Sequence, residues 1–188
     1  MRYERIGAAV MSNGRTTPAG RALEQFLEST ARAVTLLGDL PDARWQARPP
    51  GEPWSLGDTI EHLVLTNQAT LARLRAAGAT AIVADAEPVS DAAITERMFH
   101  GVPTPPGLAE PTGRWTTRAD GLAALTGVRD AIAAHVHAAG DGLRDVRLPH
   151  PVFGLFDGVQ WVLFVAAHTD NHLPQLRRLR AASPTGVR

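Results

Sequence analysis

The stretch FVAAHTDNHLPQLRRL, residues 164–179, decides the fold of this chain and carries its most informative pair of side chains. Apolar residues recur in it at helical spacing, which predicts an α-helix with one face turned inward. His168 and His172 are four residues apart, a rotation of about 400° around a helix, so both imidazoles leave the same face one turn apart. Two rings at this separation can hold one metal ion.

Four long helices are predicted, and the histidine pair lies in the last of them. The last begins after Asp157, where Gln160 stands at the position that completes a capping box. Ser55 and Asp58 form a similar start for the second helix, and Thr17 and Thr117 are N-caps for the first and third. The predicted helices cover residues 18–37, about 55–74, 118–139 and 158 to about 182.

The remaining segments predict little regular structure. No sustained alternation of apolar and polar residues occurs, and the only β-branched run of note is AIVA at residues 81–84. The Pro- and Gly-rich segment 78–116 is long, and within it residues 90–101 form a candidate short helix. So long a connection lets the third helix return parallel to the second, as in bundles with a crossover. We therefore expect an all-α four-helix bundle, with a flexible N-terminus at residues 1–16 and one domain at residues 17–183.

The composition excludes several classes of function. The 19 Arg residues balance 19 Asp and Glu, and this zero net charge argues against nucleic-acid binding and against attachment to an anionic membrane. There is no Lys, so no lysine base or Schiff base can form. There is no Cys either, so a metal would be held by imidazole and oxygen alone. The N-terminus has too short an apolar stretch for a signal peptide, which predicts a cytoplasmic protein.

A third imidazole comes from the second helix. His62 lies in WSLGDTIEHLVL, residues 54–65, about two turns into that helix and near its apolar side. At this depth it can meet His168 and His172 across the bundle. Three neutral imidazoles leave the double charge of the metal uncompensated and its other positions open to water or substrate, which indicates a chemically active site.

Other metal motifs fit less well. A metalloprotease HExxH motif needs Glu directly after the first His, and Thr169 stands there. A facial triad of two His and one carboxylate would use Asp58 or Glu61. We interpret Asp58 as the cap of its helix and Glu61 as a solvated residue, so the three-histidine set is preferred.

Two further residues are candidates for supporting roles. Gln175 follows His172 by three residues on the same side of the helix and can support the site or orient a bound ligand. Pro174 removes one helical hydrogen bond beside it, so a kink is expected there. His150, before the last helix, is either a residue of the pocket mouth or an exposed loop histidine. The aromatic residues Trp54, Trp115 and Trp161 are interpreted as packing residues.

The chain resembles the DinB/YfiT-like metalloproteins over about residues 18–182. The resemblance rests on PGEPWSLGDTIEHL, on HPVFGLFDGVQWVLFVAAHTDNHLPQL and on their order in a four-helix chain. It implies an up-down-down-up bundle, usually a homodimer, in which His62, His168 and His172 bind a divalent metal, commonly zinc or nickel. Members with assigned activity include bacillithiol and mycothiol S-transferases and a mycothiol-dependent maleylpyruvate isomerase. Others are described as metal-dependent hydrolases.

Two kinds of function follow as hypotheses. In the first, the metal lowers the pKa of an incoming thiol or water. The preferred reaction is transfer of a low-molecular-weight thiol, as cosubstrate, to a small electrophile, and metal-dependent hydrolysis is the alternative reaction. In the second hypothesis, the metal only joins the helices of a non-catalytic or stress-related bundle. The expected pocket walls are the segment 78–116 and the loop 140–157.

Overall fold

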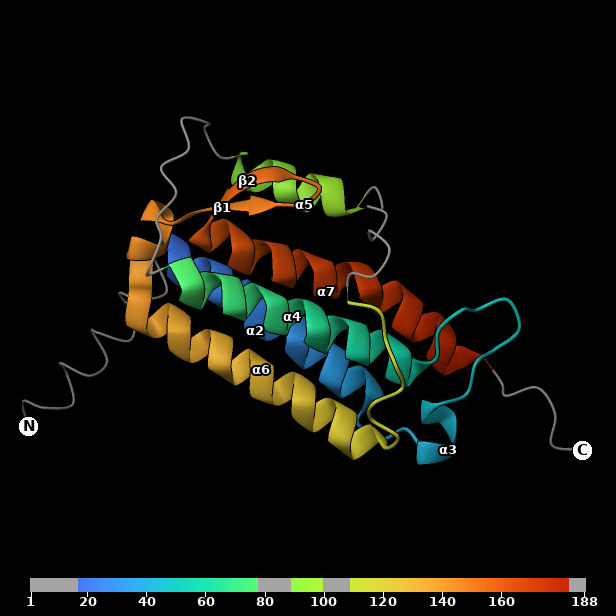
Figure 1. Ribbon diagram of the computed structural model, residues 1–188. Helices are drawn as coiled ribbons and strands as arrows, with labels where there is room; N and C mark the ends of the chain where they lie inside the picture. Colours follow the sequence, from blue (N-terminus) through green and yellow to red (C-terminus); the bar gives the residue numbers. More distant parts are fainter. Residues whose placement is uncertain (1–16, 78–88, 100–108, 183–188) are drawn as a thin grey trace, which may run out of the picture.

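Four long helices pack side by side along most of their length (Figure 1). The computed structural model describes residues 17–77, 89–99 and 109–182, so the predicted flexible segment 1–16 and the AIVA run at residues 81–84 lie outside the described residues. The bundle consists of α2 (Pro18–Leu37), α4 (Leu56–Ala77), α6 (Arg118–Ala139) and α7 (Gly158–Ala181). These bounds agree closely with those predicted from the sequence.

The helix directions define the topology. In Figure 1, α2 and α7 run one way and α4 and α6 run the other, so the order is up-down-down-up. Helix α2 packs on α7 and α6, and α4 completes the bundle against the same two helices. The all-α fold and the crossover between the second and third long helices are therefore confirmed.

Local hydrogen bonds set the helix starts. The Thr17 hydroxyl accepts from the Gly20 amide over 3.1 Å, and the Thr117 hydroxyl accepts from the Asp120 amide over 3.2 Å. At α7, the Asp157 carboxylate accepts from the Gln160 amide over 2.8 Å, and the Gln160 side-chain oxygen accepts from the Asp157 amide over 3.0 Å. Each start satisfies amides that lack a partner inside the helix, as expected for caps.

A short helix that the sequence analysis missed, α3 (Asp42–Trp45), inserts a tryptophan between two bundle helices. The Trp45 side chain is fully buried and donates to the Trp115 carbonyl over 2.8 Å. An added Cβ at Gly57 of α4 would lie 2.7 Å from its ring, and one at Gly121 of α6 would lie 2.3 Å from it. Both helices therefore need glycine where Trp45 packs.

Smaller elements cover the outer side of α7 (Figure 1). Helix α5 (Asp91–Phe99) confirms the short helix expected within residues 90–101. The 3₁₀ helix η1 (Gly140–Asp145) leads into a hairpin of β1 (Arg147–His150) and β2 (Gly154–Asp157), in which His150 pairs with Gly154. No strand was predicted for this hairpin, because a strand of four residues is too short to show a clear alternation of apolar and polar residues.

One arginine joins these elements to the bundle. Arg144 of η1 contacts the Asp157 carboxylate at 2.6 Å and the Asp91 carboxylate at 2.5 Å. Asp157 caps α7 and Asp91 begins α5, so the contact fixes α5 against the start of α7. Among the residues that the structure describes, no helix is both long and apolar enough to cross a membrane.

Candidate metal centre

The start of α4 fixes the position of its histidine. The Asp58 amide donates to the Ser55 hydroxyl over 3.0 Å, and the Asp58 carboxylate accepts from the Ser55 amide over 2.8 Å. Arg48 also pairs with this carboxylate at 3.0 Å. Burial alone would raise the pKa of Asp58, but the hydrogen bonds from Ser55 and the contact with Arg48 outweigh it and lower the pKa. Asp58 is thus the helix cap, and His62 follows one turn later.

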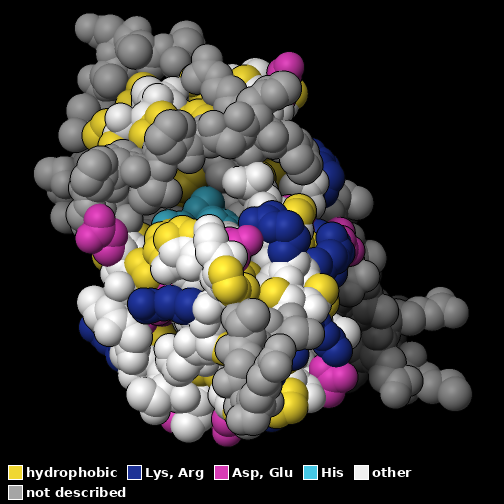
Figure 2. Space-filling model, turned by 90° about the vertical axis from the view of Figure 1, so that its right-hand side faces the viewer, with side chains coloured by type: hydrophobic (Ala, Val, Ile, Leu, Met, Phe, Trp, Pro, Cys, Tyr) yellow, Lys and Arg dark blue, Asp and Glu magenta, His cyan; other side chains and the backbone are white. Residues whose placement is uncertain are grey.

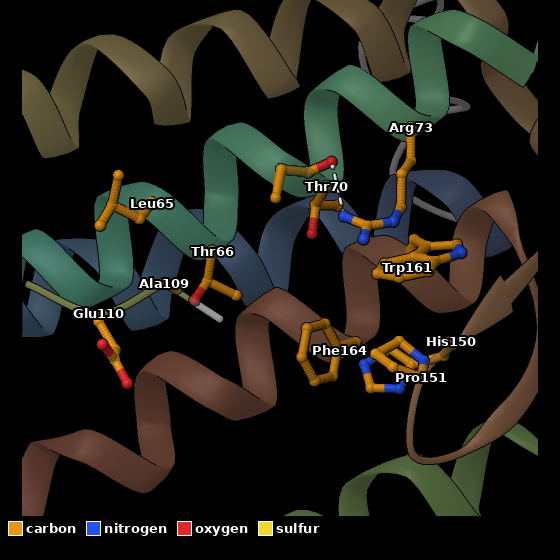
Figure 3. A pocket seen from close by; sticks show the side chains of 11 residues that line it. Leu65, Thr66, Thr70, Arg73, Ala109, Glu110, His150, Pro151, Trp161 and Phe164 are labelled. Carbon is orange, nitrogen blue, oxygen red and sulfur yellow. Dashed lines mark hydrogen bonds between the residues drawn. The ribbon is translucent and has the colours of Figure 1, made fainter. Parts of the chain in front are cut away.

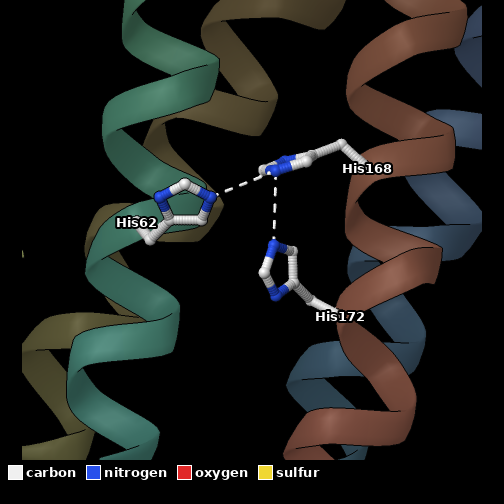
Figure 4. A group of neighbouring side chains, drawn as sticks. All are labelled: His62, His168 and His172. Atoms are coloured by element: carbon white, nitrogen blue, oxygen red, sulfur yellow. Dashed lines mark hydrogen bonds between the residues drawn. The ribbon is translucent and has the colours of Figure 1, made fainter. Parts of the chain in front are cut away.

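Three imidazoles converge between α4 and α7 (Figure 4). The Nε2 atom of His168 lies 3.1 Å from Nε2 of His62 and 3.3 Å from Nε2 of His172. One ligand atom from each residue lies within 4.8 Å of the others. His62 is 1% exposed, His168 is 8% exposed and His172 is half-buried. The structure therefore brings together the three residues that the sequence analysis selected.

Backbone and side-chain acceptors fix the tautomer of two rings. Nδ1 of His62 lies 2.9 Å from the Ala109 carbonyl oxygen, and Nδ1 of His172 lies 2.8 Å from the side-chain oxygen of Gln175. Because these oxygens only accept, each Nδ1 carries its proton and each Nε2 presents a lone pair to the centre. Such partners typically orient metal ligands. Nδ1 of His168 has no partner among the described residues.

The spacing and charge of the trio fit a divalent ion. Two nitrogen ligands about 2.0–2.1 Å from a tetrahedral zinc ion lie about 3.3–3.4 Å from each other. A hydrogen-bonded cluster fits less well, because His168 can donate from Nε2 to only one of its two neighbours. Burial lowers the pKa of all three rings, to about 4 for His62. The rings are therefore neutral near pH 7, which is the form that binds metals.

The neighbouring carboxylate does not have the role expected for it. Glu61 was interpreted as solvated, but it is 1% exposed. Its carboxylate accepts from the Thr112 hydroxyl over 2.8 Å and from the amides of Gly113 and Arg114 over 2.8 and 2.9 Å. Burial would raise the pKa of Glu61, but these hydrogen bonds lower it. Glu61 thus binds the segment before α6, and neither it nor Asp58 belongs to the histidine cluster.

Two aromatic rings flank the trio. The Trp54 ring lies 4.9 Å from the His62 ring and 6.4 Å from the His172 ring, measured between centroids. The Phe164 ring stacks on His168 at 5.6 Å. Trp54 was expected to be a packing residue, and the rings that it contacts are those of two candidate ligands. The sequence does not distinguish a tryptophan that only packs from one that packs against metal ligands, because both would stand beside the start of the helix.

A cavity of about 340 Å³ lies beside the trio, between α4 and α7 (Figure 3). Its lining includes Ala109, whose carbonyl contacts His62, and Phe164, which stacks on His168. Figure 2 shows histidine side chains at the bottom of a hollow in the surface. Pocket walls were expected from segments 78–116 and 140–157. These segments contribute Ala109, Glu110, His150 and Pro151 to the lining. Most of the wall, however, comes from the two helices: Leu65, Thr66, Ala69, Thr70, Arg73, Trp161 and Phe164.

The spacing along α4 could have revealed this wall. Thr66, Ala69 and Arg73 follow His62 by four, seven and eleven residues, which is one face of a helix. The same face therefore carries a candidate ligand, small residues that leave space, and a cation. This pattern becomes informative only when α7 is known to lie opposite.

The other candidate residues have clear positions. His150 is buried in the cavity wall, and its Nδ1 accepts from the amides of Val152 and Phe153, both at 3.2 Å. Burial lowers its pKa to about 4. Helix α7 continues through Pro174 to Ala181, and Gln175 still reaches His172. His135 and His137 lie on α6, outside the cluster, and His100 lies outside the described residues.

Fold and site together define a class: an up-down-down-up four-helix bundle with a histidine trio suited to a divalent ion between its second and fourth long helices. The chain belongs to the DinB superfamily, whose family model matches residues 25–176.

Two Bacillus subtilis proteins are similar to this chain. The protein YuaE, which is described as uncharacterized, is 23% identical over 155 residues, covering 82% of this chain and 94% of YuaE. The solved structure of YfiT superposes with a TM-score of 0.58 at 13% identity, covering 86% of this chain and 85% of YfiT. YfiT is described as a probable metal-dependent hydrolase with an unusual four-helix bundle topology. At this identity, the likeness to YfiT shows the fold.

Proposed function

We propose that this protein is a divalent-metal-dependent enzyme that transfers a low-molecular-weight thiol to a small electrophile. His62, His168 and His172 would hold the ion, with zinc or nickel as the expected metals. The observation that carries the proposal is the convergence of three Nε2 atoms at 3.1 and 3.3 Å, two of them with Nδ1 fixed as a donor. When bound, such an ion lowers the pKa of a coordinating thiol or water and supplies a nucleophile near neutral pH.

The residues of this chain would position the reaction. The Ala109 carbonyl and Gln175 orient two of the ligands, while the rings of Trp54 and Phe164 restrict water beside them. In the reaction, sulfur forms a bond to the electrophilic carbon, and the leaving group departs with the electrons of the bond that breaks. The thiol proton passes to the solvent when the thiolate forms, and the leaving group departs as an anion, so atoms and charge balance without an oxidant or a reductant.

The acid-base inventory favours a thiol over water as the nucleophile. Hydrolysis typically needs a general base beside the metal. Among the described residues, Glu61 is the carboxylate next to the trio in sequence, and three hydrogen bonds already occupy it. A thiol starts from a pKa near 8.5, so coordination alone can deprotonate it.

Metal-dependent hydrolysis is the second candidate, because one acidic side chain does line the cavity. Glu110 directly follows Ala109, whose carbonyl binds His62. Its carboxylate would accept the proton of the attacking water. The description of YfiT as a probable metal-dependent hydrolase also supports this candidate.

One set of assays tests both candidates. The metal-loaded protein is mixed with cysteine as the thiol and 1-chloro-2,4-dinitrobenzene as the electrophile, and separately with 4-nitrophenyl acetate. We expect thioether formation that is lost in the variants His168→Ala and His172→Ala, and retained in His137→Ala, an exposed histidine of α6. Ester cleavage that depends on His168 and Glu110, without thioether formation, would favour hydrolysis. Bound metal with neither activity would identify a non-catalytic bundle and overturn the proposal.

A further inference from the structure

The cavity beside the histidines carries charge at both ends and apolar walls between them. Figure 3 shows Glu110 and Ala109 at one end and Arg73 with Trp161 at the other end, with Phe164 between the two ends. Its volume of about 340 Å³ lies within the usual range of small-molecule sites. Such a cavity selects ligands by shape along its walls and by charge at its ends.

Arg73 provides the positive end. Its Nη1 donates to the Ala69 carbonyl over 3.2 Å, and its guanidinium carbon lies 5.3 Å above the Trp161 ring. Among the described residues, no carboxylate pairs with it, so most of its five N–H donors have no protein acceptor. A guanidinium positioned over an aromatic ring can receive a carboxylate in bidentate fashion through its free N–H groups.

A second polar group supports the same end of the cavity. The hydroxyl of Thr70 is buried, with the residue 1% exposed, and has no hydrogen-bond partner among the described residues. Thr70 lines the cavity and directly follows Ala69, the residue whose carbonyl accepts from the guanidinium. Leaving a buried hydroxyl unpaired costs about 1–3 kcal/mol, so a ligand acceptor at this position would recover that cost.

The ends also set the direction of an anionic ligand. Arg73 attracts a carboxylate at one end, whereas the exposed acidic side chain of Glu110 lies at the other. His150 lies between the aromatic residues and has a pKa of about 4, so it is neutral near pH 7 and adds no competing charge. The Arg73 guanidinium folds back to the level of Ala69, seven residues or about 10 Å along the helix from His62.

We propose that this cavity binds a small organic carboxylate with an apolar body, whose carboxylate pairs with Arg73 and accepts from Thr70. The body lies against Phe164 and Trp161, and its far end reaches the histidine trio about 10 Å away. That this carboxylate is the electrophilic substrate rests on the proposed function; that it binds does not. Arg73 is then the residue that determines specificity.

The test uses two ligands of equal size that differ in charge. Calorimetric titration of 3-phenylpropanoate and of its neutral amide is done on metal-free protein in excess chelator, which removes binding of the carboxylate to a metal. We expect the acid to bind roughly 10- to 100-fold more tightly than the amide, the range for a charged hydrogen-bonded pair. Equal affinities, or no binding of either ligand, would overturn the proposal.

Variants assign the preference to the cavity. Arg73→Met should abolish the preference for the acid, and Arg73→Lys should retain part of it. Thr70→Val should weaken binding of the acid a few-fold, because the ligand loses one hydrogen-bond donor. The matched control is Arg75→Met, because Arg75 is an exposed arginine on the same helix that does not line this cavity. An unchanged preference in folded Arg73→Met would contradict the proposal.

A last variant separates this proposal from the proposed function. The doubly substituted His168→Ala, His172→Ala protein should keep the preference for the acid over the amide, because the guanidinium that sets this preference lies about two helical turns along α4 from His62. If the acid binds but no thioether or ester chemistry is found, the function is wrong and the binding site stands. If chemistry is found without a preference for acids, the binding proposal alone fails.

Discussion

Nδ1 of His62 donates to the carbonyl of Ala109 over 2.9 Å, although the two residues are 47 positions apart. The preceding residue, Glu61, binds the amides of Gly113 and Arg114 in the same segment. Two adjacent residues of α4 thus hold one loop, and that loop in turn orients a candidate metal ligand. Ala109 has a φ of 54°, a conformation that costs energy for a residue with a Cβ and persists where surrounding contacts impose it.

Glu61→Gln should loosen the loop without removing a ligand. An amide keeps the shape but replaces one of the two accepting oxygens by an NH2 group that only donates, so we expect a loss of about 1–3 kcal/mol in the free energy of unfolding. Zinc affinity should fall roughly 10- to 100-fold, as for other groups that orient ligands. Urea denaturation and competition with a chromogenic chelator measure these effects. Glu96→Gln, at an exposed position of α5, should change neither quantity; unchanged zinc affinity in Glu61→Gln would refute the link.

Gln175 should act on the metal through His172. Replacing it by Leu removes the acceptor at 2.8 Å from Nδ1, so the proton on Nδ1 loses its partner and the tautomer is no longer fixed. We expect zinc affinity to fall roughly 10- to 100-fold in Gln175→Leu, by the same chelator competition. Gln175→Glu retains an acceptor and should restore the affinity. If Leu and Glu at this position behaved alike, an orienting role would be excluded.

Three glycines inside helices should respond to alanine with opposite signs. At Gly57 and Gly121 an added Cβ would meet the Trp45 ring at 2.7 and 2.3 Å, so each substitution should cost about 1–3 kcal/mol in the free energy of unfolding. At Gly127 of α6 nothing lies within 4 Å, so alanine should stabilise the protein by roughly 0.5–1 kcal/mol through helix propensity. Urea denaturation of the three variants checks the signs. Destabilisation by Gly127→Ala would show that the α6 surface packs against something there.

His150 should make the metal-free protein sensitive to acid. Its pKa falls from 6.5 to about 4 on folding, because burial disfavours the charged ring. The unfolded chain therefore takes up a proton first, so the stability from this residue is present above pH 6.5 and is lost as the pH falls towards 4. Between pH 7.5 and 5 the expected loss is about 2 kcal/mol.

His150→Phe isolates this contribution, since phenylalanine keeps a ring and does not titrate. Chelator-treated wild type and variant are unfolded with urea at several pH values. The free energy of unfolding of the variant should decline less steeply between pH 7.5 and 5. Parallel curves would show that other groups, such as the histidine trio, account for the whole acid sensitivity.

The sequence by itself determined the features that depend on neighbours along the chain. Apolar spacing and capping residues such as Thr17 and Asp157 set the bounds of the long helices, because caps act within three or four residues. The same local geometry placed His168 and His172 on one helix face, and the position of His62 in its helix indicated the third member of the trio.

Only the tertiary structure decided how the surroundings of the site are built. The burial of Glu61 and the choice of Ala109 as the partner of His62 depend on a loop that is distant in sequence. The contact of Trp54 with His172 depends on the packing of α7 beside α4. Arg73 became a cavity residue only because α7 places Trp161 beneath it. A helix has one periodicity but several possible neighbours, so the sequence predicts which face is buried, whereas packing decides which groups meet there.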